Sequence, residues 1–188
     1  PMPVLIDGKI YYEGVDLTQE EFYQKQVSGA DIATSQPAPG DVIAVWKKVL
    51  EGHDQLVYIP MSAGLSASCA TAQMLAENFD GRVQVADNRR ISVTQRYSVL
   101  DALAMTQTGM DAAQIRQILE EQGDDSCIYI SVDTLKYLRK GGRVTGAEAI
   151  AGTMLNIKPV LEIRGEKLTP VGKVRGMKAA RKLMIQKV

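Results

Sequence analysis

The fold class is set by residues 56–68, which read Leu56-Val57-Tyr58-Ile59-Pro60 followed by Met61-Ser62-Ala63-Gly64-Leu65-Ser66-Ala67-Ser68. The first five residues form a short apolar run of the kind found in buried strands. The next eight are rich in Ser, Ala and Gly, and they lead into a helix predicted from about Ser66 to Asn78. This order of strand, polar loop and helix is typical of a parallel α/β sheet.

The surrounding sequence repeats the same alternation. Apolar runs at 83–86 and 127–132 predict two further strands, and apolar periodicity predicts helices at 41–50, 92–108 and 111–121. Upstream, residues 3–6 and 9–12 are expected to form a hairpin around Asp7-Gly8, and Thr18 with Glu21 forms a capping box that starts a helix ending near Val27. Residues 31–40 are expected to be a polar loop. The pattern favours an α/β fold with a parallel sheet and flanking helices.

The pattern changes beyond Val132. Short helices are predicted at 133–140 and 146–155, a hairpin at 158–163 and 167–171, and a basic helix at 176–187. We therefore expect two domains with a boundary near residue 125. Residues 1–125 would form an N-terminal α/β domain that carries the polar loops. Residues 126–188 would form a second, smaller α/β (α+β) domain, incomplete at its C-terminus.

The composition excludes several classes of protein. Of the 188 residues, 45% are hydrophobic and 23% are charged, and the formal net charge is zero. These values do not favour disorder or a general affinity for nucleic acid. No apolar run approaches the ~18 residues of a membrane helix, and the start, Pro1-Met2-Pro3, does not resemble a signal peptide. Cys69 and Cys127 lie in apolar stretches and are expected to be reduced thiols, which favours a cytoplasmic location.

The zero net charge hides an uneven distribution. Residues 158–188 contain nine Lys or Arg and two Glu, so the rest of the chain is acidic. A basic segment of this kind indicates an acidic partner or a phosphate. A solvated helix face explains the same pattern equally well.

The motifs of the common cofactor sites are missing. The one histidine, His53, lies between Gly52 and Asp54 in a predicted loop, and there is no CxxC pair. The sequence therefore predicts no metal site. It also has no GxxxxGK[ST] phosphate loop and no dinucleotide fingerprint, so we expect no cofactor.

Two polar loops carry the chemistry that the chain does have. One contains Thr34 and Ser35, and the other contains Ser62 and Ser66. The second loop follows a predicted strand directly, and ligands of parallel α/β sheets bind at that end of a strand. Hydroxyl groups and the amides of a helix N-terminus favour an anion there. Ser, Thr and Gly are also common in helix caps and turns, which is the plainer explanation for either loop alone.

The second loop also allows a different chemistry. Residues 64–68 read Gly-Leu-Ser-Ala-Ser, which is close to the G-x-S-x-G nucleophile elbow of serine hydrolases. In that fold the histidine of the triad follows the serine, whereas His53 precedes Ser66. A serine without a base is a poor nucleophile. A hydrolase with Ser66 as nucleophile is therefore the alternative function.

Five motifs in the order of the chain resemble those of the DegV family. Thr34-Ser35-Gln36-Pro37 matches the family's TSQP signature, and Ser62-Ala63-Gly64-Leu65-Ser66-Ala67 is similar to its SSGLSG loop. Residues 133–144, DTLKYLRKGGRV, resemble the block DTLEYLRKGGRI. Residues 155–161 and 173–176 are similar to later landmarks of the family.

The resemblance implies a two-domain α/β fold that buries a long-chain fatty acid. It implies that Thr34 and Ser66 hold the carboxylate, with help from Ser35 and Ser62. It also implies a carrier that is not itself an enzyme and that presents its acyl chain to a separate fatty-acid kinase. We add the hypothesis that Arg143 and Arg175 form a face for that partner or for a transferred phosphate.

The chain departs from the family pattern at several places. Ala63 and Ala67 stand where the family has Ser and Gly, so one hydroxyl of the loop is missing. The opening strand with its Asp-Ser-Thr segment and the final segment with its Thr-His pair have no counterpart. We therefore expect this sequence to be an internal fragment.

Overall fold

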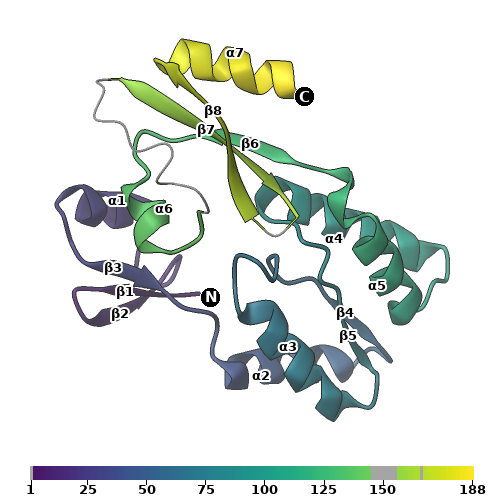
Figure 1. Cartoon of the computed structure of the whole chain (residues 1–188). Helices are drawn as coiled ribbons and strands as arrows, with labels where there is room; N and C mark the ends of the chain where they lie inside the picture. The colour runs from purple at the N-terminus through teal and green to yellow at the C-terminus, as the bar shows by residue number, and fades with distance from the viewer. Residues whose placement is uncertain (1, 145–155, 166) are drawn as a thin grey trace.

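The computed structural model describes residues 2–144, 156–165 and 167–188. Its strands form three sheets (Figure 1). The first sheet has the order β2-β1-β3 and consists of β1 (Pro3–Ile6), β2 (Lys9–Tyr12) and β3 (Ile32–Thr34), all antiparallel. Helix α1 (Gln19–Val27) lies between β2 and β3 in the chain and begins at the capping box of Thr18 and Glu21. Its Phe22 packs on the apolar cluster of Val4, Ile6 and Leu17.

The second sheet is parallel and is covered by helices on both faces. It pairs β4 (Leu56–Tyr58) with β5 (Val83–Val85). One face packs against α2 (Pro39–Leu50), α3 (Ser68–Ala76) and the 3-10 turn η1 (Glu77–Phe79). The other face packs against α4 (Ser92–Gln107) and α5 (Ala112–Glu121). Because successive strand residues point to opposite faces, Leu56 and Tyr58 join one apolar cluster while Val57 and Ile59 join the other.

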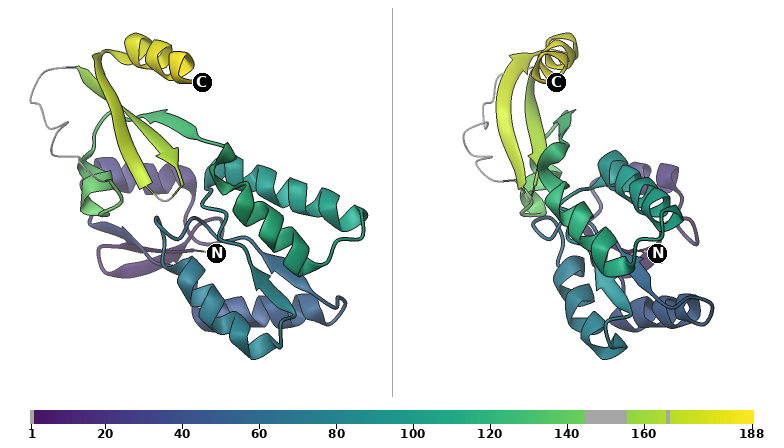
Figure 2. Two further views of the ribbon diagram at one scale, coloured as in Figure 1. Left: turned by 45° about the vertical axis from the view of Figure 1, so that its right-hand side comes forward. Right: turned by 90° about the vertical axis from the view of Figure 1, so that its right-hand side faces the viewer.

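The third sheet has the order β6-β7-β8 and is antiparallel. After η2 (Gly123–Asp125) come β6 (Ile128–Ser131), α6 (Lys136–Lys140), β7 (Ile157–Arg164) and β8 (Lys167–Arg175). The basic helix α7 (Met177–Lys187) contacts all three strands and buries Ala180 against them (Figure 2). The proposed division at residue 125 falls between η2 and β6, where this sheet begins.

The predicted α/β class with a parallel sheet and flanking helices is confirmed, and so are both hairpins. One local prediction is wrong. Residues 32–34 are not loop but strand β3, because they pair with β1 across the whole of α1. The strand expected at 127–132 is confirmed as β6, which pairs with β7 in the antiparallel sheet. The helix expected at 146–155 lies outside the described residues.

Trp46 anchors the core under the parallel sheet. Its side chain is 1% exposed, and its ring meets Tyr58 and Phe79 edge to face at centroid distances of 5.2 and 5.5 Å. These contacts tie α2 to β4 and η1 and so fix the support beneath the loop that follows β4.

We expect Trp46→Ala to lower the free energy of unfolding by about 3–5 kcal/mol, because it leaves a large cavity. Urea denaturation followed by circular dichroism measures this change. The neighbouring Val45 is 60% exposed, so Val45→Ala is the matched control and should change stability by less than about 0.5 kcal/mol. Equal effects of the two substitutions would contradict this role of Trp46.

Candidate functional site

A cavity of about 480 Å³ lies where the three sheets meet. Its wall receives residues from the end of β3, the turn after β4, the loop after β5, and the β6, α6, β7 and β8 region. These residues are Met2, Thr34, Ser35, Gln36, Met61, Leu65, Ser66, Ala67, Ile91, Ile130, Tyr137, Leu138, Gly141, Arg143, Ile163 and Leu168. The cavity therefore brings together the two polar loops that the sequence singled out.

The hydroxyl groups of the cavity come from two loops that are tied to each other. Thr34 ends β3, and Ser35 follows it with its amide bonded to the carbonyl of Pro3 at 3.2 Å. The next residue, Gln36, accepts a hydrogen bond at Oε1 from Thr71 Oγ1 of α3 at 3.1 Å. This bond links the first loop to the helix that follows the second loop, so Thr34 and Ser66 line one cavity.

Ser66 also forms a local turn with Ser68 at the start of α3. Its Oγ accepts from the amide of Ser68 at 3.2 Å and donates to Ser68 Oγ at 3.0 Å. If the hydroxyl rotates, its proton can point to an anion in the cavity while its oxygen still accepts from the Ser68 amide.

Arg143 adds a cation to the same cavity. It follows the Gly141-Gly142 turn after α6, and its guanidinium donates to the carbonyl of Gly141 and, from Nε at 3.4 Å, to the carbonyl of Leu65. The second bond joins Arg143 to the turn that carries Ser66. A guanidinium beside hydroxyl groups is a suitable environment for a carboxylate.

The rest of the wall is apolar. Leu65 and Leu168 form a buried cluster with Leu161, and Met61, Ile91, Ile130, Leu138 and Ile163 pack against it. Nine side chains of the cavity offer only hydrocarbon or thioether surface, and these belong to Met2, Met61, Leu65, Ala67, Ile91, Ile130, Leu138, Ile163 and Leu168. The cavity combines a polar, cationic part with a larger apolar part.

Ser62 and Arg175 do not line this cavity. Ser62 is fully buried, and its Oγ donates to the carbonyl of Gly165 in the β7–β8 turn at 3.3 Å. Arg175 is exposed at the end of β8, opposite Ile157. Of the residues named from the sequence, the structure thus places Thr34, Ser35, Ser66 and Arg143 around one cavity and leaves Ser62 and Arg175 outside it.

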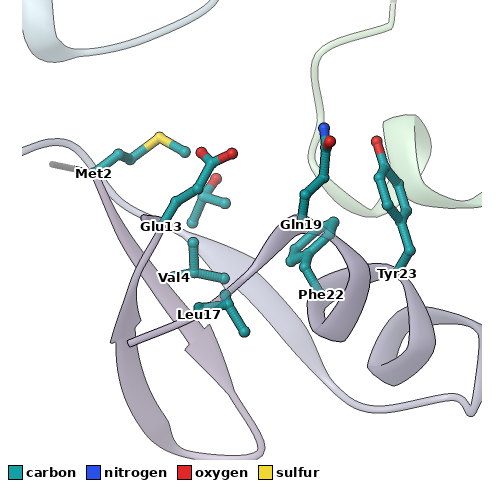
Figure 3. A pocket seen from close by; sticks show the side chains of 8 residues that line it. Met2, Val4, Glu13, Leu17, Gln19, Phe22 and Tyr23 are labelled. Carbon is teal, nitrogen blue, oxygen red and sulfur yellow. The ribbon is translucent and has the colours of Figure 1, made fainter. Parts of the chain in front are cut away.

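A smaller cavity of about 220 Å³ adjoins the first at Thr34 and Met2, which line both (Figure 3). Its other walls come from the β1–β2 hairpin and from α1, with Val4, Leu17 and Phe22 beneath and Glu13, Gln19 and Tyr23 beside it. This cavity was not predicted, because its lining residues come from separate elements and form no sequence motif.

The geometry does not support the serine hydrolase. His53 is the chain's one histidine, and it lines a different cavity with Gln55 and Met110 between β4, α4 and α5. Ser66 has Ser68 as its side-chain partner and no imidazole among the residues of its cavity. It therefore lacks the general base that a serine nucleophile needs.

Two searches of the described ranges give a negative result. In residues 2–144, 156–165 and 167–188, no group of three or more His, Cys, Asp or Glu is arranged to hold a metal ion. Within the same ranges, no helix has the length and apolar character needed to cross a membrane.

Cys69 follows the serine loop directly and is fully buried in α3. Burial, together with the carboxylates of Asp87 and Glu120, raises the pKa of its thiol to about 11 from the ordinary value of 9.0. Cys127 is partly exposed. The thiol after the candidate site is therefore a packed core group and not a nucleophile.

We expect a disulfide reagent at pH 8 to label Cys127 in the folded protein and to reach Cys69 only after unfolding.

The raised pKa of Cys69 also makes stability depend on pH. Because the Cys69 pKa is higher in the folded state, its contribution to stability is complete below pH 9 and is lost as the pH rises toward 11. Urea denaturation at several alkaline pH values measures this loss, and Cys69→Ala should flatten the profile. In the labelling experiment, rapid reaction of Cys69 in the folded protein would contradict its burial in α3.

Comparison with known proteins places these features in a family. The family model described as "Uncharacterised protein, DegV family" matches residues 1–188. A DegV domain-containing protein of Deinococcus radiodurans is 35% identical over 181 residues, which is 96% of this chain and 64% of that protein. The chain thus spans slightly less than two thirds of the length of this relative.

Solved structures agree with this match. A DegV family protein from Thermus thermophilus, described for its fatty acid binding, has a TM-score of 0.89 and 34% identity, and the match covers 100% of this chain and 67% of that one. A fatty acid binding DegV family protein from Streptococcus agalactiae has a TM-score of 0.86 and 32% identity, covering 99% and 67%. On the match over its whole length and on these likenesses, the chain belongs to the DegV family.

Proposed function

We propose that this chain is the larger part of a cytoplasmic carrier that binds one long-chain fatty acid, and that it has no catalytic activity of its own. The observation that carries the proposal is the cavity itself, in which Thr34, Ser66 and Arg143 line the polar part and Leu65 and Leu168 help form the apolar part. The fatty acid binding named for the Thermus thermophilus and Streptococcus agalactiae proteins supports the same ligand.

In this proposal the hydroxyl groups of Thr34, Ser35 and Ser66 hold the carboxylate, and Arg143 balances its charge. Ser62 contributes indirectly, because its side chain is used for the bond to Gly165. A bound anion needs these donors because its burial without partners is costly. No cofactor takes part.

The apolar tail provides most of the affinity. Burial of a CH₂ group contributes ~0.8 kcal/mol, so a tail of ~14 such groups offers on the order of 11 kcal/mol before the costs of binding. A hydrogen bond to a charged group contributes roughly 1.5–3 kcal/mol. The head group is therefore fixed in place by bonds that are weak enough to be broken, which suits a carrier that passes its ligand to a fatty-acid kinase.

The proposed domains share the cavity between them. Met61, Leu65 and Ile91 belong to the first proposed domain, and Ile130 and Ile163 belong to the second. A tail between two domains can be released by a small movement of one against the other. This arrangement supports a carrier more than a permanent structural lipid.

Extraction of the purified protein followed by mass spectrometry tests the proposal directly. We expect long-chain fatty acids at close to one per chain. Detection of no acyl chain, together with no binding of added fatty acid, would end the proposal.

We expect Thr34→Ala combined with Ser66→Ala to weaken fatty-acid binding by about 100-fold or more, because two donors to a charged group are lost. Titration with a fluorescent fatty acid measures the change. Thr108→Ala combined with Ser28→Ala is the matched control, because both residues are exposed and lie outside the cavity lining. Unchanged affinity in the first double variant would remove these hydroxyls from the site.

The roles of the two arginines can be separated. Arg143 lines the cavity and Arg175 does not, so we expect Arg143→Glu to lower lipid occupancy. Arg175→Glu should leave occupancy unchanged and slow phosphorylation of the carried lipid by a fatty-acid kinase, if this residue forms part of the partner face. Normal phosphorylation in Arg175→Glu at normal occupancy would exclude that role.

A further inference from the structure

The loop that follows β5 holds two residues in a strained backbone conformation. Arg89 has a φ of 56° and Ser92 a φ of 58°, and both lie in the left-handed region that non-glycine residues rarely adopt. Such conformations persist only where the surrounding structure determines them, and they concentrate at ligand sites. The loop between them includes Ile91, which lines the candidate site.

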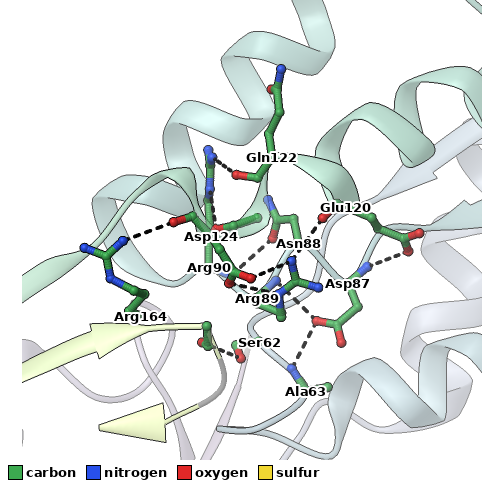
Figure 4. A network of polar contacts seen from close by, with 12 residues as sticks. Ser62, Ala63, Asp87, Asn88, Arg89, Arg90, Glu120, Gln122, Asp124 and Arg164 are labelled. Carbon is green, nitrogen blue, oxygen red and sulfur yellow. Dashed lines mark hydrogen bonds and ion pairs between the residues drawn. The ribbon is translucent and has the colours of Figure 1, made fainter. Parts of the chain in front are cut away.

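Two partly buried arginine side chains hold this loop in place (Figure 4). Arg89 donates to both carboxylate oxygens of Asp124 at 3.2 Å and to the carbonyl of Glu120 at 3.2 Å. Arg90 donates to the carbonyls of Gln122 and Gly123 and to Ser98 Oγ. The loop is thus fastened to the end of α5 and to η2 rather than to the cavity.

The loop after β5 packs so closely against η2 that position 123 must be a glycine. A Cβ atom at Gly123 would lie 2.7 Å from the carbonyl oxygen of Asn88 and 2.8 Å from the Arg89 guanidinium. Asn88 is itself fully buried and donates to Ser98 Oγ. The loop therefore has little freedom to move.

The same loop is hydrogen-bonded to the start of the turn that carries Ser66. Asp87 Oδ1 accepts from the amide of Ala63 at 3.2 Å, and the carbonyl of Arg90 accepts from the amide of Ser62 at 3.0 Å. The carbonyl of Ser62 in turn accepts from the amides of Leu65 and Ser66 at 3.0 and 3.1 Å. An unbroken series of bonds thus runs from η2 to Ser66.

We propose that Asp87 is a positioning residue for the head-group site, which fixes Ser66 through the Ala63 amide without touching the ligand. This inference rests on the proposed function, since it assumes an anion beside Ser66. Asp87 does not line the cavity. The negative charge of Asp87 would repel a bound carboxylate, so Asp87 cannot favour binding by electrostatic attraction. Its contribution must therefore come from its hydrogen bond to the Ala63 amide.

Substitutions of Asp87 separate the effect of its hydrogen bond to the Ala63 amide from the effect of its charge. Asp87→Asn keeps an oxygen acceptor for the Ala63 amide and removes the charge, so it should bind a long-chain fatty acid as tightly as the unchanged protein or more tightly. Asp87→Ala removes the acceptor and should weaken binding about 3- to 10-fold. Titration with palmitate labelled with ¹³C at its carboxyl carbon reports affinity and, through the carboxyl resonance, the surroundings of the head group.

Asp87→Ser is a second variant for the case that Asp87→Ala does not fold. Asp87 Oδ1 also accepts from the amide of Arg89 at 3.4 Å, and a serine hydroxyl can replace this local bond but is too short to reach Ala63. Asp87→Ser should share the weaker binding and the shifted resonance. Asp101→Ala, on the exposed side of α4, controls for the loss of one carboxylate and should change neither.

The outcomes distinguish the two proposals. If the unchanged protein binds no palmitate, the proposed function fails. If it binds palmitate but Asp87→Ala and Asp87→Ser bind equally well with an unchanged carboxyl resonance, the positioning role alone is refuted. If Asp87→Asn shows the same loss as Asp87→Ala, the charge of Asp87 matters and not its bond to the turn, which also overturns the inference.

Discussion

Strand β4 pairs in parallel with β5, with Leu56 opposite Val83 and Tyr58 opposite Val85. Because the pairing is parallel, the chain leaves both strands at the same edge of the sheet, and the turns after them are neighbours. One turn carries Ser66 and the other carries Asp87 and Ile91. The contact between the two turns, and hence the wall of the candidate site, depends on this pairing.

The parallel pair can exist only because helices cover it on both faces. Trp46 and Cys69 fill one side, and Ala86, Ile115 and Leu119 fill the other. The same packing that excludes water from the strands makes Cys69 unreactive, since its thiolate would be formed in an apolar environment.

Much of this arrangement follows from local sequence. The capping box of Thr18 and Glu21, the Asp7-Gly8 turn and the hairpin around Gly165 are all formed by residues close together in the chain, and each was predicted at its place. Strand β3 was not predicted, because its partner β1 lies beyond α1. The position of Arg143 at the cavity and the inward bond of Ser62 were missed for the same reason, since both depend on contacts with residues far along the chain.

Ser62 and Ser66 lie in the same loop but have different surroundings. Both are hydroxyl residues of the same short motif, yet Ser62 is fully buried against Gly165 while Ser66 faces the cavity. A buried hydroxyl needs a partner inside the protein, so Ser62 can hold the β7–β8 turn but has no freedom to serve a ligand. Ser66 accepts a hydrogen bond from the Ser68 amide and has a proton that can rotate, so it can serve a ligand without losing that bond. The proposed carrier needs both kinds of residue, because the fixed hydroxyl of Ser62 holds the turn in place while the hydroxyl of Ser66 can reorient.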